Sequence, residues 1–347
     1  MFLGAGMRHR SIPVKYPAMS TSAIPSPHTQ VIPAAQNLFK ASVLLALLFT
    51  SFFAADRIVE SLDRTTVLPA AAAVSLTWAA VLALASIDFV LITGLGVLAH
   101  DAVHRVLFRS PFWNELFGGL LSAFVLVPFY ANRQFHLTHH SYAHQPGLDP
   151  ENTQHNHSFL YAATVGSVIA LQEQYRILFS NLLRIHDRRY TARVLKDLGF
   201  VAFGVAVYGA LLPALGISLA VTLLPVLLVF PPLFAFRALS DHYGIPPIVR
   251  ETKKREDVLD ADEETWHADR ERRQREISGW VVLTAPWLEW LWSHVNYHEV
   301  HHKYPYLSHR YLPEVFAATR DRHPYLVVNG YCRSLFNLRR RAYYGAP

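Results

Sequence analysis

Long uncharged apolar runs alternate with polar, histidine-rich segments along the chain. Residues 41–55 carry no charge, and Leu38, Phe39 and Lys40 extend this run because lysine can bury its stem and keep its ammonium at a membrane surface. Residues 65–87 are also uncharged, and the apolar pattern continues after Asp88 as far as residue 99. A helix needs about 20 mainly apolar residues to cross a bilayer. Both runs therefore predict membrane spans.

A third uncharged run, residues 198–236, is too long for one span, and Pro213 with Gly216 offers a turn within it. Two shorter tryptophan-containing runs are expected at the membrane interface or in a re-entrant hairpin, namely residues 112–130 and 280–292. The pattern predicts an all-α integral membrane protein with four spans in two hairpins, at residues 38–55, 66–99, 198–213 and 217–236.

Composition agrees with this prediction, because 52% of the residues are hydrophobic and 17% are charged, whereas soluble domains carry about 25% charged residues. Residues 1–37 are rich in Pro, Ser and Thr, and we expect a disordered cytosolic arm followed by one membrane domain over residues 38–347. Basic residues in the connection 131–197 place that connection in the cytosol. The mixed-charge segment 246–278 is expected to be solvated at the membrane surface.

The chain has one cysteine, Cys332, and 19 histidines. A single cysteine excludes a disulfide framework and a cysteine-based zinc or iron–sulfur site within the chain. A metal would therefore be held by His, Asp or Glu.

Three histidine boxes carry the candidate chemistry: His100-Asp-Ala-Val-His104, His136-Leu-Thr-His139-His140 and His298-Glu-Val-His301-His302. Residues three and four apart share one face of a helix, so each box directs its imidazoles to a common point. Eight imidazoles are too many for one ion, which favours two metals. The histidines interpreted as hydrogen-bonded surface residues are His9, His28, His155, His157, His186, His267, His309 and His323.

The boxes resemble those of the membrane fatty-acid desaturase superfamily, which includes acyl-lipid desaturases and carotenoid hydroxylases and ketolases. The resemblance covers about residues 80–315 and extends to His144, to Asp149-Pro-Glu151 and to the residues around the third box, Asn296 to Pro305. It also implies a further ligand at His242, just after the last span. Some members place an asparagine four residues before that histidine, where this chain has Ala238.

The resemblance implies a cytosolic helical cap that holds two non-haem iron ions and uses O₂ as co-substrate. The substrate is expected to be a lipid from the bilayer, and electrons are expected from a ferredoxin or a cytochrome b5-type protein, with no nucleic-acid partner. Asp101, Asp241 and Glu299 are candidates for orienting the imidazoles. The implied metal ligands are also the expected catalytic residues: His100, His104, His136, His139, His140, His242, His298, His301 and His302.

A fatty-acyl desaturase is the preferred reading, and a carotenoid hydroxylase or ketolase is the alternative. The third box also fits His-Glu-x-x-His, the pattern of zinc proteases with glutamate as general base, but an intramembrane protease would leave the other boxes unexplained. A metal transporter should place its ligands near the middle of the membrane, whereas these boxes lie at the ends of the predicted spans.

Overall fold

The computed structural model describes residues 20, 24–64, 69–151, 158–184, 186–245 and 274–338. Most of the expected arm and most of the charged segment 246–278 lie outside these residues. Within the described part the protein is mainly helical, with one small sheet.

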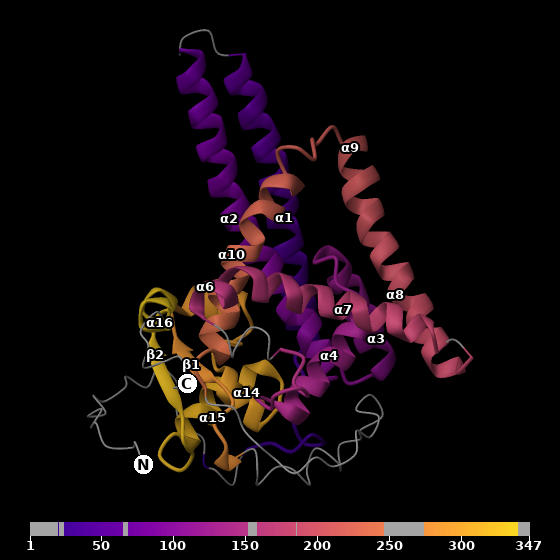
Figure 1. Ribbon diagram of the computed structural model, residues 1–347, viewed down its shortest axis with the longest axis vertical. Helices are drawn as coiled ribbons and strands as arrows, with labels where there is room; N and C mark the ends of the chain where they lie inside the picture. Colours follow the sequence, from indigo (N-terminus) through magenta and orange to yellow (C-terminus); the bar gives the residue numbers. More distant parts are fainter. Residues whose placement is uncertain are drawn as a thin grey trace.

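Four helical segments are long and apolar enough to cross a membrane, as predicted. They are α1 (Ala34–Asp63), α2 (Ala70–Val103), α8 (Arg188–Ala206), which continues through η3 (Val207–Leu211) and α9 (Leu212–Ala214), and α10 (Leu223–His242). The predicted hairpin turn lies after α9, where Gly216 has a positive φ of 76°. All four segments extend to the same side of the molecule (Figure 1).

Helix α2 joins the two parts of the molecule. Its 34 residues span about 51 Å at 1.5 Å per residue, against about 30 Å for the apolar core of a bilayer. Its buried residues begin only at Val81, so the second half of the helix is the enclosed half. Leu44 and Leu48 of α1 pack there against Leu95 and Leu98 in the main hydrophobic core.

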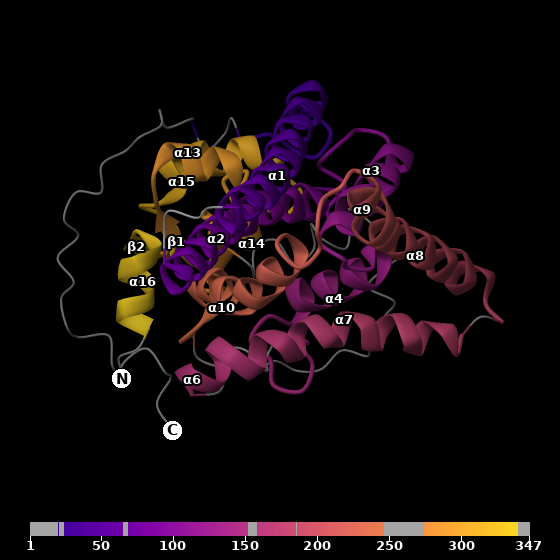
Figure 2. The ribbon, with the colours of Figure 1, turned by 90° about the horizontal axis from the view of Figure 1, so that it is seen from above.

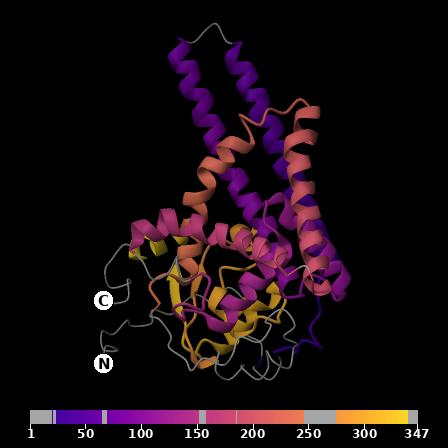
Figure 3. The same cartoon turned by 45° about the vertical axis from the view of Figure 1, so that its right-hand side comes forward.

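The run 112–130, expected at the interface or in a re-entrant hairpin, contains one short helix and the first two residues of the next. Helix α3 (Pro111–Phe124) and helix α4 (Phe129–Tyr142) meet at a bend of 99°. Further along the chain, α6 (Phe159–Tyr161) and η2 (Ala162–Gly166) lead into α7 (Ser167–Leu182), which lies crosswise to the spans (Figures 1 and 3). Seen from above, α7 follows one edge of the molecule (Figure 2).

The remaining elements form a cap below the spans (Figure 1). Residues 280–292 do not form one apolar element there, because β1 (Trp280–Leu283) pairs in parallel with β2 (Leu326–Asn329), with Trp280 opposite Leu326, before α13 begins. The helices of the cap are α13 (Pro286–Leu291), α14 (His298–Lys303), η4 (His309–Tyr311), α15 (Leu312–Thr319) and α16 (Tyr331–Leu338).

Candidate metal centre

Four helices bring the histidines of the motifs together. The first box occupies the last turn of α2, the second occupies α4, and the third is α14 itself. His242 is the last residue of α10. All nine predicted ligands therefore lie where the spans meet the cap.

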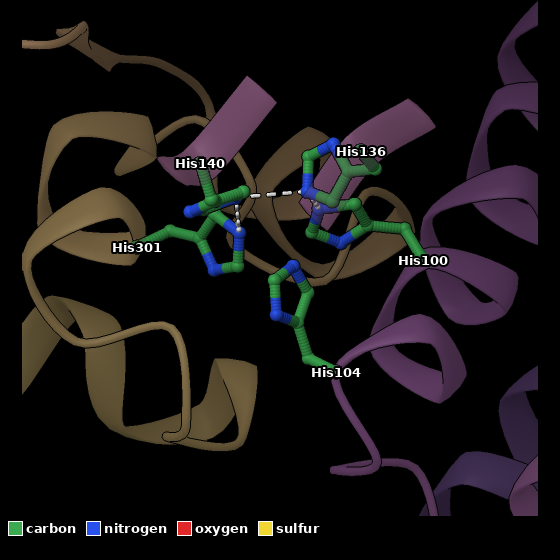
Figure 4. A group of neighbouring side chains, drawn as sticks. All are labelled: His100, His104, His136, His140 and His301. Carbon is green, nitrogen blue, oxygen red and sulfur yellow. Dashed lines mark hydrogen bonds between the residues drawn. The ribbon is translucent and has the colours of Figure 1, made fainter. Parts of the chain in front are cut away.

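Five imidazoles form one group, drawn in Figure 4, and their ligand nitrogens lie within 4.8 Å of one another. The Nε2 atom of His136 lies 2.8 Å from Nε2 of both His100 and His140. The Nε2 atom of His301 lies 3.1 Å from that of His140. In the described part of the chain, buried Nε2 of His104 has no hydrogen-bond partner. Such a group offers several nitrogens to one central cation.

A second group consists of His139, His242 and His302, again with ligand nitrogens within 4.8 Å of one another. His298 adjoins it, because its Nε2 atom lies 2.7 Å from Nε2 of His242 and 3.2 Å from that of His302. Metal–imidazole bonds are about 2.0–2.1 Å long, so two ligands at right angles are separated by about 3 Å. The observed separations fit this requirement.

Two ring orientations in the second group are fixed from outside. His139 donates from Nδ1 to Asp149 Oδ1 over 2.9 Å, and His242 donates from Nδ1 to the Ser278 carbonyl over 2.7 Å. In the neutral form each imidazole carries one proton, here on Nδ1, and its Nε2 atom is then a lone pair. These lone pairs converge, and a cation between them removes their repulsion. The residues present therefore fit a metal.

Electrostatics keep most of these ligands neutral. Burial, reinforced by neighbouring imidazoles, lowers the pKa of His298, His301 and His302 well below the ordinary value. Burial also acts on His139, but Asp149 and Glu151 outweigh it and raise its pKa to about 9, so this imidazole loses a proton when it binds a metal. A neutral imidazole is the form that binds metal.

The three acidic residues expected to orient imidazoles make their main contacts elsewhere. Glu299 accepts from the Ser278 N–H over 2.8 Å and pairs with Lys303 over 2.7 Å. Asp241 pairs with Arg237 over 2.8 Å and stays 3.8 Å from His298 Nδ1.

Asp101 accepts from His309 Nδ1 over 2.5 Å and lies 3.9 Å from His100 Nδ1. The prediction of a surface role for His309 is therefore wrong, because its side chain is buried against the first box. Sequence spacing gave no signal for this pair, which joins residues 208 positions apart.

Asp149 and Ser278 hold imidazoles, yet no such role was assigned to either from sequence. The sequence feature that could have indicated the role of Asp149 is the Asp149-Pro-Glu151 motif, to which it belongs. Ser278 acts through its backbone carbonyl, and that carbonyl also accepts from Nε2 of the buried His144 over 2.8 Å. Because any residue can supply a backbone carbonyl, this role cannot be predicted from residue type.

Of the histidines predicted to lie at the surface, His28 and His186 are exposed as expected. His9, His155, His157 and His267 lie outside the described residues.

A largely apolar cavity of about 200 Å³ reaches both groups. His100, His136, His242 and His298 line it at the metal centre, together with Glu151. The carboxylate of Glu151 lies 3.9 Å from His136 Nδ1 and 3.9 Å from His139 Nε2.

The sequence matches the fatty acid desaturase family over residues 75–329, which is well over half of the chain and includes all nine histidines. The chain belongs to the fatty acid desaturase family. No curated protein gives a significant match to it. Family membership, the apolar helices and the clustered histidines together make it a membrane protein of the desaturase-type oxidoreductase class.

Proposed function

We propose that the chain is a di-iron enzyme that uses O₂ and externally supplied electrons to desaturate a lipid chain, most simply a fatty-acyl chain. The observation that carries this proposal is the pair of histidine groups at the wall of an apolar cavity. Five imidazoles suit one ion, and three imidazoles with the adjoining His298 suit a second. When bound, the iron pair supplies the oxidising power for removing hydrogen from an unactivated C–H bond.

The protein itself contributes binding, orientation and exclusion of water. Apolar residues such as Ile92, Val125 and Leu171 line the cavity and hold a lipid chain against the histidines. Asp149 and the Ser278 carbonyl fix two rings in the orientation needed for binding metal. An apolar enclosure also protects reactive species from water.

Electrons would come from a ferredoxin or a cytochrome b5-type protein, because the sequence contains no flavin, haem or iron–sulfur motif. The cap is proposed to face the cytosol, since basic residues dominate the connection between the two hairpins. That face is then the docking side for the donor.

The geometry argues against a zinc protease, because Glu299 is not placed to act as the general base. Glu299 would have to face a metal-bound water, but its carboxylate lies in a buried pair with Lys303 and also accepts from the Ser278 N–H. The transporter reading is weakened too, because the histidine groups lie at the ends of α2 and α10.

Metal analysis of the purified protein, combined with product analysis after supplying reductant, O₂ and host membrane lipids, tests the proposal. We expect about two irons per chain, in line with the two groups, and new double bonds in acyl chains. His301→Ala should lose both metal and product, whereas His186→Ala, which changes an exposed histidine, should keep both. If the products are oxygenated carotenoids, the proposed metal site stands and the substrate is a carotenoid instead of a fatty-acyl chain. Stoichiometric zinc without lipid product would refute the mechanism.

A further inference from the structure

The cavity beside the metal centre has apolar walls with a few polar groups set into them. Val125, Val127 and Leu171 are among its apolar lining, and Ser122 and Gln174 are polar residues in the same lining. Polar groups in such a cavity fix the orientation of a ligand, because each loses its water and needs a partner.

Ser122 lies on α3, near its end, and its side chain is 1% exposed. Several other helical serines satisfy their hydroxyls on their own helix. Ser141 donates to the Leu137 carbonyl over 2.9 Å, and Ser240 donates to the Phe236 carbonyl over 3.0 Å. This is the usual way in which a serine within a helix is satisfied. By contrast, Ser122 Oγ has no hydrogen-bond partner within the described part of the chain.

Gln174 approaches the cavity from α7, on a different side. Its Oε1 atom is buried, and it too has no hydrogen-bond partner among the described residues. The neighbouring residue Tyr175 donates from its hydroxyl to the Leu126 carbonyl, which holds α7 against the end of α3. Two buried oxygens from separate helices are therefore left for a ligand in the cavity.

The contacts between α3 and α2 place Ser122 beside the first histidine box. Gly118 of α3 packs against Ala102 of α2, and Val125 packs against Gly96. Since the two helices run antiparallel here, Ser122 lies opposite the stretch of α2 between these contacts. His100 belongs to that stretch.

We propose that Ser122 and Gln174 form a subsite for a hydroxyl group on the lipid substrate, an inference that rests on the proposed function. A hydroxyl is both a donor and an acceptor, so a hydroxyl in the cavity can accept from Ser122 Oγ–H and can donate to an acceptor such as Gln174 Oε1. Holding the hydroxyl near His100 would also fix which carbon of the chain reaches the metal centre.

Equilibrium binding to the metal-loaded, full-length protein tests the subsite. The probes are stearate and the set of monohydroxystearates that differ only in the position of the hydroxyl, each competing with radiolabelled stearate. The variants are Ser122→Ala and Gln174→Leu. Ser167→Ala is the matched control, because Ser167 lines the same cavity but donates its hydroxyl to the Ala162 carbonyl over 3.2 Å.

We expect at least one hydroxystearate to bind about tenfold more tightly than stearate, because a buried unsatisfied group gains its partner. Ser122→Ala and Gln174→Leu should remove this preference, and Ser167→Ala should keep it. Stearate binding without any preference for a hydroxyl, or equal loss of preference in Ser167→Ala, would overturn the subsite alone. Failure of every chain to bind would overturn the proposed function as well.

Discussion

Asp149 is a carboxylate that sets the state of a buried imidazole. It accepts the Nδ1 proton of His139 and so directs the Nε2 lone pair toward the second histidine group. Loss of such a partner typically weakens metal binding by about 10–100-fold. We expect this loss of affinity in Asp149→Ala, measured by metal titration of the metal-free protein. Asp321→Ala, which removes an exposed carboxylate, should bind metal normally. Unchanged affinity in Asp149→Ala would show that His139 does not depend on this bond.

Protonation of the third box gives a prediction for pH. The pKa values of His298, His301 and His302 are lowered by burial, so the unfolded chain binds more protons than the folded, metal-free protein once the pH falls below about 6.5. Stability present above that pH is then lost as the pH falls, by roughly 1 kcal/mol per histidine and pH unit.

His139 acts in the opposite sense. Its pKa is raised to about 9, so its contribution is present at low pH and is lost as the pH rises toward that value. Burial also raises the pKa of Glu299 to about 7, so this carboxyl too favours the folded state as the pH falls. These two groups do not balance the three histidines. We therefore expect the thermal midpoint of the metal-free protein to fall as the pH is lowered through about 6.5, with a shallower fall in His302→Gln. A midpoint that rises on acidification would contradict this assignment.

Residue spacing was sufficient to predict that the imidazoles within each box converge, because each box needs only helical geometry, whereas His242 was expected from the family resemblance. Residue spacing was not sufficient to predict which residues hydrogen-bond to the imidazole rings and orient them. The pair of His309 and Asp101 and the carbonyl of Ser278 depend on contacts between segments far apart in the chain. Such contacts leave no periodic pattern in a single sequence.

Close helix contact in the membrane depends on glycine at the crossing of α8 with α3. A Cβ atom on Gly204 would lie 2.2 Å from the Ala123 carbonyl oxygen, whereas one on Gly199 of the same helix would meet nothing within 4 Å. We expect Gly204→Ala to lower the free energy of unfolding by about 1–3 kcal/mol, because a backbone atom cannot move aside as a side chain can. Gly199→Ala should be neutral or stabilising, since alanine favours helix. Thermal unfolding in detergent compares the stability of the two variants. Equal effects would argue against close contact between α8 and α3 at Gly204.

Among the elements, the four spans were predictable because long apolar runs carry a strong signal. The observed ends of the helices differ from the predicted ends. Helix α1 begins at Ala34 and reaches Asp63, beyond the predicted residues 38–55, because a helix continues into polar sequence once it is packed. Strands β1 and β2 were not predicted. Each has four residues, and their partners lie 46 positions apart, as for Trp280 and Leu326.

The orientation of the whole molecule can be tested with its single cysteine, Cys332, which is exposed on α16 in the cap. If the cap faces the cytosol, a membrane-impermeant maleimide should label Cys332 only after cells are permeabilised. Arg64→Cys in a Cys332→Ser background places the label at the opposite end of the spans, after α1, and should react in intact cells. The reverse pattern would invert the proposed topology.

The order of the ligands along the chain also determines when a metal centre can be completed during synthesis. The five-histidine group needs His301, and the three-histidine group needs His302. About 200 residues separate these from His100, so at about 5–20 residues per second the ribosome takes roughly 10–40 s to pass from the first box to the third. Through that interval neither group has its full set of ligands. An ion bound early would be held by fewer imidazoles, and either group can gain its full set of ligands only after the last third of the chain has emerged.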